Sequence, residues 1–406
     1  MMDIISLFET LVKIPSPSLG EYNVSEKIKE ITYTNGINAY YDNYQNLIIN
    51  IPANDNSKKP LLLSAHMDVV GNSSPVNIRY SEDKKFIETD KSRTLGADDK
   101  AGVTCALSLA LYLKEHPEIT HGGLEIVLTR DEETNMTGIN HVEFDKIESE
   151  NVLVLDSDSL GNFEIAGAGY TKLDIEVTTK LGGHSGNDIR DKKRYNAAKL
   201  IADLVSKLPN GVFKVEKGFT ITSCNLGSII AGAVDIGVER LIEKENIEKP
   251  YSKTLISLCA DNVINTSAYA HYSLRSSDKK YEEKLINKFQ HEIDKFNKKY
   301  GEWANAKLTV KIHMLPFEKS PNQIMSDIAK KVGKKINLPV KIQSFHAGAE
   351  THVYANKLNK FNNKFKPVLV GVANIHSMHS PNEKIEIESL KKGFEFVKEI
   401  FLEYNK

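Results

Sequence analysis

Four short apolar runs, each followed by side chains that can bind a metal ion, constrain the fold of this chain most. Continuous apolar runs of this length are typical of strands that are covered on both faces. The runs and the polar residues that follow them are Leu61–Leu63 with His66 and Asp68, Leu124–Leu128 with Asp131, Glu132 and Glu133, Val152–Leu155 with Asp156, and Val368–Val370 with His376 and His379. In sheets of this kind, ligands bind beyond the carboxyl ends of the strands. The pattern therefore predicts a buried sheet with a functional site at one edge.

Amphipathic segments between these runs predict helices that cover the sheet. Between Asp99 and Glu115 the apolar residues recur with helical spacing, and Pro117 ends the segment. Similar stripes occupy residues 323–336 and 388–404. The fold class predicted for this part of the chain is α/β, a three-layer α/β/α catalytic domain.

The middle of the chain has a different pattern. Apolar and polar residues alternate around 173–177, 268–274 and 308–312, as on half-exposed strands, and helical stripes cover 197–208 and 285–296. The order is roughly β-α-β-β-α-β, which predicts a two-layer α+β domain. We expect this lid or dimerisation domain at 168–316, inserted into a discontinuous metal-binding domain at 1–167 plus 317–406. Residues 229–261 show little pattern and predict an extended loop or an extra hairpin.

Composition excludes several classes of protein. The 406 residues carry 53 Lys and Arg against 54 Asp and Glu, so a net charge of −1 gives no electrostatic case for nucleic acid or membrane partners. The three cysteines have no metal-binding spacing, and no apolar run approaches the length of a membrane span. The first residues lack the basic and apolar regions of a signal peptide. We expect a soluble protein of a reducing cytoplasm.

The polar residues after the strands have the chemistry of a metal centre. His66 and Asp68 are two residues apart on extended backbone, so both can face one site, with Asp68 orienting the imidazole. Asp98 opens a helix, where it could be a simple cap or a carboxylate that bridges two metal ions. In the acidic turn after the second run, one carboxylate could bind a metal while its neighbour acts as a general base. Imidazole and carboxylate ligands suit Zn²⁺, with Mn²⁺ or Co²⁺ as alternatives.

Five motifs in this order resemble those of the dinuclear metallo-exopeptidases that include peptidase T, aminoacyl-histidine dipeptidase and carnosinase. The motifs are His66–Asp68, Gly96–Gly102, Asp131–Glu133, Leu155–Ser157 and His379–Lys384, preceded by a matching segment at Leu11–Ser18. The resemblance implies that His66 and Asp156 hold one metal ion, that Glu133 and His379 hold the other, and that Asp98 bridges them. It also implies Glu132 as the general base, Asp68 as the partner of His66, and a cis peptide bond between Asp98 and Asp99.

The same resemblance assigns roles to the inserted domain. His184, in Leu181–Gly186, is similar to the lid histidine that steadies the oxyanion, often in the active site of a dimer partner. Arg275 resembles the lid arginine that receives a substrate carboxylate, and Asn262 resembles a lid asparagine near the substrate. Gly348 falls in a glycine-containing loop where the family binds substrate. A homodimer is implied.

Several positions depart from the family pattern. Asp158 follows Asp156 closely and is a rival ligand, and His376 lies three residues before His379. Asn265 stands where the lid motif usually has proline. The predicted activity is hydrolysis of short peptides by a dipeptidase or tripeptidase. The alternatives are a deacylase acting on N-acyl amino acids and a metal- or peptide-binding protein without catalysis.

Overall fold

The structure is a computed structural model and describes residues 3–216, 218–231, 262–321 and 324–406. It divides into two compact units, one formed by Met1–Gly167 with Phe317–Lys406 and the other by Ala168–Pro316. Among the helices in these ranges, none combines the length and the apolar character that crossing a bilayer requires. Each unit has its own hydrophobic core and is described separately below.

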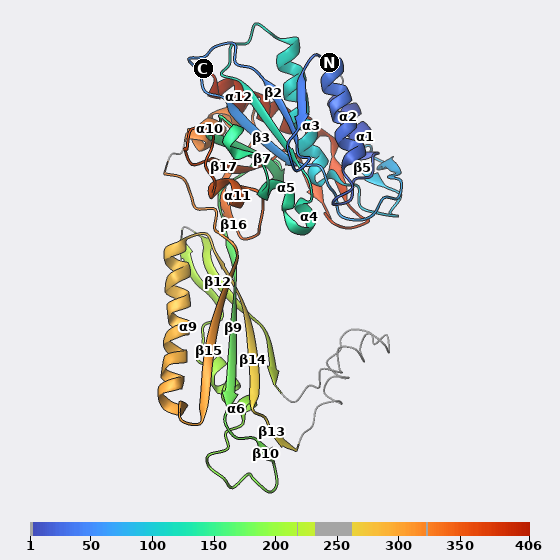
Figure 1. Cartoon of the computed structure of the whole chain (residues 1–406). Coiled ribbons are helices and arrows are strands. Elements are labelled where there is room, and N and C mark those ends of the chain that lie inside the picture. Colours follow the sequence, from blue (N-terminus) through green and yellow to red (C-terminus); the bar gives the residue numbers. More distant parts are fainter. Residues whose placement is uncertain (1–2, 217, 232–261, 322–323) are drawn as a thin grey trace. The chain divides into compact units, whose positions relative to one another are not determined.

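The first unit is built on an eight-stranded mixed sheet (Figure 1). Its strand order is β1-β2-β6-β3-β7-β17-β8-β16. The strands are β1 (Asn38–Tyr41), β2 (Leu47–Ile51), β3 (Leu61–His66), β6 (Leu124–Thr129), β7 (Asn151–Ser157), β8 (Asn162–Gly167), β16 (Lys341–Phe345) and β17 (Lys366–Gly371). The central strands β6, β3, β7 and β17 are parallel neighbours, so their carboxyl ends lie at one edge. All four apolar runs predicted as strands belong to this parallel centre.

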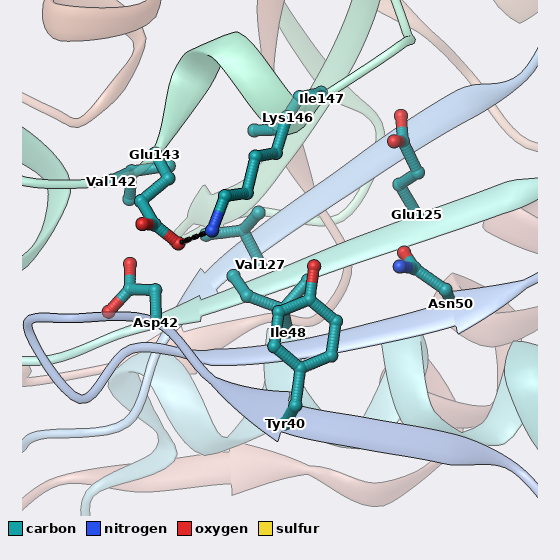
Figure 2. A pocket seen from close by; sticks show the side chains of 10 residues that line it. All are labelled: Tyr40, Asp42, Ile48, Asn50, Glu125, Val127, Val142, Glu143, Lys146 and Ile147. Carbon is teal, nitrogen blue, oxygen red and sulfur yellow. Dashed lines mark hydrogen bonds and ion pairs between the residues drawn. The ribbon is translucent and has the colours of Figure 1, made fainter.

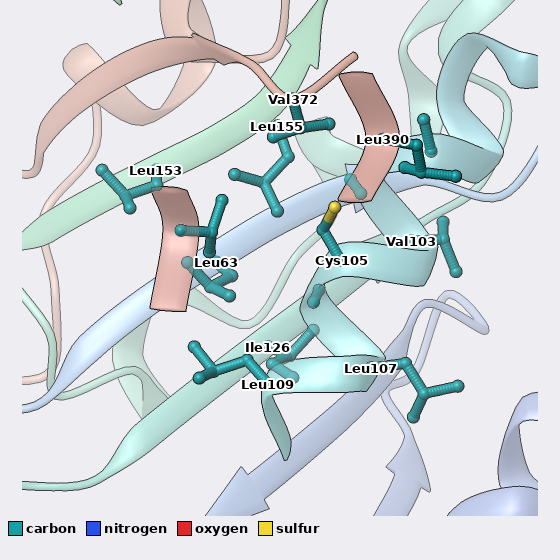
Figure 3. Packing of buried hydrophobic residues seen from close by; sticks show 14 of the residues in the cluster. Leu63, Val103, Cys105, Leu107, Leu109, Ile126, Leu153, Leu155, Val372 and Leu390 are labelled. Carbon is teal, nitrogen blue, oxygen red and sulfur yellow. The ribbon is translucent and has the colours of Figure 1, made fainter. Parts of the chain in front are cut away.

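Side chains of β3 alternate between two cores because successive residues of a strand point to opposite faces. Leu61, Leu63 and Ala65 join the larger core, which Figure 3 shows around Cys105. Leu62 joins a smaller core on the other face. Burial on both faces explains why this strand has no polar residue before Ser64.

Helices cover both faces of the sheet and complete three layers. The larger core is covered by α1 (Ile4–Val12), α2 (Tyr22–Thr34), α3 (Ala97–Glu115), α10 (Ile324–Lys335) and α12 (Ile387–Tyr404). Shorter elements contribute to the smaller core, namely α5 (Thr137–Asn140), the 3₁₀ helix η1 (Phe144–Lys146) and α11 (Thr351–Ala355), whereas α4 (Glu132–Asn135) has no buried residue. The predicted α/β fold class with helices on both faces is confirmed.

A small antiparallel sheet connects two loops that contribute to the site. Its order is β18-β19-β5-β4, with β4 (Ile78–Tyr80), β5 (Phe86–Thr89), β18 (Ile375–His376) and β19 (Lys384–Glu386). The segment between β18 and β19 carries His379, and β5 is followed by the loop that enters α3. Pairing of β19 with β5 therefore brings the His379 loop to the start of α3.

The second unit is a five-stranded antiparallel sheet with two helices packed against it. The strand order is β11-β12-β14-β9-β15. The elements are β9 (Gly169–Thr179), α6 (Ala197–Val205), β11 (Gly211–Glu216), β12 (Phe219–Ala231), β14 (Ser267–Ser276), α9 (Lys279–Tyr300) and β15 (Ala304–Met314), with a separate two-stranded pair of β10 (Gly183–His184) and β13 (Val263–Ile264). Alternate residues of β9, Leu173, Ile175 and Val177, are buried against the helices, as the alternating pattern predicts.

The segment with little sequence pattern is only partly described. Its first residues, 229–231, belong to β12 and pair with β14, so they are strand rather than loop. The remaining residues of the predicted loop or hairpin, 232–261, lie outside the described residues, as does Cys259.

Candidate metal centre

Parallel pairing gathers three of the predicted motifs at one edge of the large sheet. His66, the last residue of β3, is level with Thr129 at the end of β6. The register of β3 with β7 pairs Ser64 with Val154, so His66 is level with Asp156 two residues further on. The acidic turn that begins at Asp131 follows β6 directly. The strand ends therefore bring imidazole and carboxylate groups together at one edge of the sheet.

The first cluster of donor atoms contains His66, Asp98 and Asp156. His66 Nε2 lies 3.2 Å from Asp98 Oδ1 and 3.5 Å from Asp156 Oδ1. His66 Nδ1 lies 3.0 Å from the carbonyl oxygen of Asp68, which can only accept a hydrogen bond. Nδ1 therefore carries a proton, and in the neutral ring the lone pair of Nε2 faces the two carboxylates.

The second cluster contains Asp98, Glu133 and His379. His379 Nε2 lies 3.0 Å from Asp98 Oδ2 and 3.1 Å from Glu133 Oε2. The two oxygens of Asp98 thus belong to different clusters, because Oδ1 faces His66. The peptide bond between Asp98 and Asp99 is cis, as the family resemblance predicts.

The donor atoms have the spacing of groups that surround a cation. In a tetrahedral site with metal–ligand bonds near 2.0–2.1 Å, neighbouring donor atoms are roughly 3.3 Å apart. The four nitrogen–oxygen distances in the two clusters fall between 3.0 and 3.5 Å. In addition, Glu133 Oε1 is buried without a hydrogen-bond partner among the described residues. The donor set and this orphaned oxygen fit two divalent cations that share Asp98.

Electrostatics support the same conclusion. Burial raises the pKa of Asp156 to about 7 and that of Glu133 to about 7, because neither carboxylate is well solvated. Contact with Asp98 raises the pKa of His379 to about 9. Burial lowers the pKa of His66, but the carboxylates of Asp156, Asp68 and Asp98 outweigh burial and hold it well above its ordinary value. So many buried carboxylates need positive charge, which a cation supplies better than a protonated imidazole.

Glu132 lies next to the clusters but belongs to neither. Burial raises its pKa well above the ordinary range of a glutamate. Its backbone N–H donates to Asp68 Oδ1 at 3.0 Å, and the N–H of Glu133 donates to Asp68 Oδ2 at 3.1 Å. Asp68, which is fully buried, therefore contacts both the acidic turn and His66. The distance from Asp68 Oδ1 to His66 Nδ1 is 3.4 Å. The arrangement provides a half-buried carboxylate that can exchange a proton beside two cation sites.

The two rival ligands lie outside both clusters. Asp158 is exposed, and its side chain accepts a hydrogen bond from Ser159. His376 is exposed on β18 and packs edge-on against Phe86. The structure therefore brings together His66, Asp98, Glu133, Asp156 and His379, and leaves these two residues aside.

The residues of the second unit that were predicted to stabilise the oxyanion or to bind substrate fall into two groups. His184 pairs with Val263 between β10 and β13, and the carbonyl oxygen of Asn262 accepts the N–H of Ser185 at 2.9 Å. Arg275 lies near the opposite end of β14, with its guanidinium 4.5 Å from the ring centre of Tyr170. Gly348, in the first unit, is exposed in the loop between β16 and α11.

Several buried polar residues support the centre and were not predicted as site residues. Glu383 accepts the N–H groups of Gly96 and Asp98, at 2.8 and 3.2 Å, and so holds the turn before α3. Lys100, which is 1% exposed, donates to Ser16 Oγ and to the carbonyl oxygen of Met67. Both residues lie inside the recognised motifs, so their position in the sequence could have indicated that they belong to the site. Their contacts depend on tertiary structure.

A separate pocket lies over β1, β2 and β6 (Figure 2). It is lined by Tyr40, Ile48 and Val127 and by an ion pair between Glu143 and Lys146 at 2.8 Å. None of the residues predicted for chemistry lines this pocket. It is therefore not the site that the motifs describe.

The known proteins that are similar to this chain include peptidases of the family that the motifs resemble. Peptidase T of Fusobacterium nucleatum is 22% identical over 390 residues, which is 93% of this chain and 82% of the relative. The crystal structure of aminopeptidase PepT from Bacillus cereus superimposes with a TM-score of 0.81 at 21% identity, covering 99% of this chain and 98% of that one. The Bacillus subtilis YXEP protein, a dinuclear metal-binding peptidase of the M20 family, matches with a TM-score of 0.67 at 12% identity, covering 98% and 96%. At these identities the two structures establish the fold.

Family membership follows from a broader match. The model of peptidase family M20/M25/M40 matches residues 62–403 and so includes all five predicted metal ligands. The family resemblance predicted from the motifs is confirmed. The protein belongs to peptidase family M20/M25/M40.

Proposed function

We propose that this protein is a dinuclear metal-dependent exopeptidase, a dipeptidase or tripeptidase, that hydrolyses short peptides. One observation carries the proposal. A single carboxylate, Asp98, takes part in two donor clusters, and a half-buried carboxylate outside them, Glu132, follows the same sheet edge. This combination matches the needs of amide hydrolysis, which are an activated water and a group that moves its proton.

His66 and Asp156 would hold one divalent cation, Glu133 and His379 the other, and Asp98 both. Zn²⁺ is the expected ion because the ligands are imidazole and carboxylate, and Mn²⁺ and Co²⁺ are the alternatives. When bound, two such cations acidify a water molecule and polarise the scissile carbonyl group. Asp68 would keep the proton on His66 Nδ1 so that Nε2 remains a ligand.

Glu132 is the group that we assign to proton transfer. It would accept a proton from the attacking water and return it to the leaving amine. Burial raises the pKa of Glu132, so its carboxylate holds a proton more readily than a solvated glutamate does. Hydrogen bonds from the turn to Asp68 would keep its backbone in place during the reaction.

Arg275 would bind the carboxylate of the substrate and so favour short peptides. Its planar fork can donate two parallel hydrogen bonds to a carboxylate, and stacking on Tyr170 limits its rotamers in advance. Asn262 and Gly348 would contact the substrate backbone. These three roles rest on the family resemblance.

His184 would stabilise the oxyanion in the active site of a second copy of the chain. His184 Nδ1 accepts the N–H of Gly186 at 3.1 Å, so Nε2 carries the proton and can donate. His184 pairs with Val263, which precedes the start of β14 at Ser267. Arg275 lies eight residues after Ser267, so the strand between Ser267 and Arg275 is roughly 27 Å long at 3.4 Å per residue. An extended tripeptide spans only about 10 Å. The two residues of one copy are too far apart to contact one such peptide, which supports a homodimer with the inserted domain as the dimerisation domain.

We place the enzyme in a reducing cytoplasm. Cys105 and Cys224 are buried and unpaired, which suits a compartment that keeps thiols reduced. The balanced charge leaves short peptides, rather than nucleic acid or membranes, as the expected partners.

A substrate screen with one variant tests the proposal. Wild-type protein loaded with Zn²⁺, Mn²⁺ or Co²⁺ is incubated with di-, tri- and tetrapeptides and with N-acetyl amino acids. We expect turnover of di- or tripeptides, and a loss of at least about 100-fold in kcat for Glu132→Gln with both metal ions retained. Turnover of N-acetyl amino acids alone would indicate a deacylase, and absence of all turnover would indicate a binding protein. Wild-type kcat in Glu132→Gln would rule out this base.

A further inference from the structure

The acidic turn is held by two buried carboxylates, one of which lies outside every recognised motif of the site. Three consecutive backbone N–H groups of this turn donate to them. Those of Glu132 and Glu133 donate to Asp68, and that of Asp131 donates to Glu21 Oε1 at 3.0 Å. The Asp131 N–H belongs to the Arg130–Asp131 peptide, which is joined to the Asp131–Glu132 peptide through one Cα atom, so a shift of this amide is passed on to Glu132.

The carboxylate of Glu21 is directed at this turn rather than at its own helix. Glu21 is the residue that precedes α2, yet its side chain makes no capping hydrogen bond to that helix. Instead Oε1 accepts the N–H of Leu19 at 2.7 Å in addition to that of Asp131, and Oε2 lies 3.3 Å from Arg130 Nη2. The residue is only 3% exposed. A buried carboxylate with three such contacts has a fixed position.

The same N-terminal segment also contacts the other carboxylate. Ser18 Oγ donates to Asp68 Oδ2 at 2.7 Å, and Val69 N–H donates to the carbonyl oxygen of Ser16 at 2.9 Å. Residues 16–21 therefore supply one of the two acids that hold the turn, Glu21, and contact the other, Asp68. This segment lies more than 100 residues before the turn, so its link to the site exists only in the folded chain.

The turn has a backbone conformation that needs such support. Asp131 has φ 53° and ψ 41°, which lie in the left-handed region. Residues other than glycine are disfavoured there by about 1 kcal/mol or more. Hydroxyl groups of Thr134 and Thr137 donate to the Asp131 carboxylate and stabilise it from within the turn. Glu21 is the acceptor for its buried N–H. Without that acceptor the amide loses its partner and the turn can relax.

We propose that Glu21 is a positioning residue for this peptidase: it fixes the turn so that Glu132 and Glu133 reach the reacting water and the second cation. The inference rests on the proposed function, which assigns proton transfer to Glu132 and metal binding to Glu133. Glu21 itself touches neither substrate nor metal. Its effect is on the geometry of the two residues that do.

The test compares Glu21→Ala and Glu21→Gln with the wild type and with Glu30→Ala, because Glu30 is an exposed glutamate within α2. Each protein is measured for kcat and KM on the best peptide, for thermal unfolding, and for binding of Zn²⁺ by calorimetry. In Glu21→Ala we expect kcat to fall by up to about 100-fold with KM little changed, since small misplacements of catalytic groups have effects of that size. Glu21→Gln keeps an acceptor oxygen and should recover most of the activity. Glu30→Ala should match the wild type.

Calorimetry separates failure of this inference from failure of the proposed function. In Glu21→Ala, the affinity of one of the two Zn²⁺ sites should fall, because Glu133 moves, while that of the other site stays unchanged. This readout holds even if the wild type cleaves no peptide, a result that would overturn only the proposed function. The positioning role is overturned if both sites bind as in the wild type, or if Glu21→Gln is as impaired as Glu21→Ala while both remain folded. If Glu21→Ala does not fold, Glu21→Asp, one methylene shorter, takes its place, and wild-type affinity and kcat in that variant overturn the role.

Discussion

Asp98 Oδ2 lies 3.0 Å from His379 Nε2, although the two residues are far apart in the sequence. The other oxygen of the same carboxylate, Oδ1, lies 3.2 Å from His66 Nε2. This carboxylate is the only group that the two donor clusters have in common among the described residues. The loop that carries His379 and the turn before α3 are held together by Glu383, which accepts the Asp98 N–H at 3.2 Å.

Removal of the shared carboxylate should weaken both metal sites. We expect Asp98→Ala to bind fewer than two Zn²⁺ ions and to lose at least about 100-fold in kcat/KM, because each metal ion contributes several kcal/mol to catalysis. Metal content after dialysis and peptide turnover measure the effect. Asp158→Ala is the matched control, since Asp158 is exposed and belongs to neither cluster. Normal metal content in Asp98→Ala, or metal loss in Asp158→Ala, would contradict the ligand assignment.

Metal uptake should release protons and become stronger as pH rises. In the metal-free site the pKa of Asp156 is raised to about 7, that of Glu133 to about 7, and that of His379 to about 9. Metal ligands must be deprotonated, so below these values protons compete with the cation. Affinity is therefore expected to increase from about pH 6 to pH 9 and then to level off. Calorimetric titration in buffers of different ionisation enthalpy counts the protons released, and a count of zero at neutral pH would contradict the expectation.

Deprotonation of Glu350 should lower the free energy of unfolding of the metal-free protein as pH rises toward neutral. It is 1% exposed and accepts a hydrogen bond from Ser64, and burial raises its pKa from 4.5 to about 7. Because the pKa is higher in the folded state than in the unfolded state, the folded protein holds the proton more tightly, and protonation stabilises it. This contribution to the free energy of unfolding is fully present below about pH 4.5 and is lost as pH rises through about 7. Glu350→Gln imitates the neutral form. Between pH 5 and pH 8 the free energy of unfolding should therefore shift in favour of the variant by about 1–3 kcal/mol.

Urea unfolding of both proteins with a chelator present measures this shift. The chelator removes the contribution of metal binding, and comparison with the wild type cancels the other titrating carboxylates. Glu30→Gln, an exposed substitution, provides the control and should show no pH-dependent difference. A stability difference that does not change with pH would mean that Glu350 is not protonated in the folded protein near neutral pH.

Two inactive variants should restore activity when they are mixed. If His184 acts in the active site of a second copy, His184→Ala and Glu132→Gln are each inactive, but a mixed dimer contains one site with both residues intact. After co-refolding in equal amounts, random pairing should give about a quarter of the wild-type activity, because half of the dimers are mixed and each has one working site. Turnover is measured with the best peptide. Activity no higher than that of the separate variants would indicate that His184 acts within its own copy or has no role.

Much of the first unit was predictable because its signals are local. Short apolar runs such as Leu61–Leu63 favour strands buried on both faces, and β3 is such a strand. The helices α10 and α12 have the expected apolar stripe, whereas α3 is buried on nearly every side, polar residues included. Parallel strands then place His66 and Asp156 at the same edge. His66 and Asp68 are two residues apart on extended backbone, which predicts that their side chains face the same site. Strand ends thus indicated His66 and Asp156, whereas the full set of five predicted ligands was named from the family resemblance.

Tertiary structure decided which of several similar residues take part and what supports them. Asp156 and Asp158, or His376 and His379, have the same chemistry in the sequence, and only the folded backbone directs one of each pair into a cluster. The separation of His184 from Arg275 depends on the length of β14 between them. Glu21 and Glu350 had no local signal, because their roles come from contacts with residues far away in the chain. The sequence by itself determined the donors and the strands that carry them. The tertiary structure decided their geometry, because hydrogen bonds and burial between distant segments depend on how the chain packs.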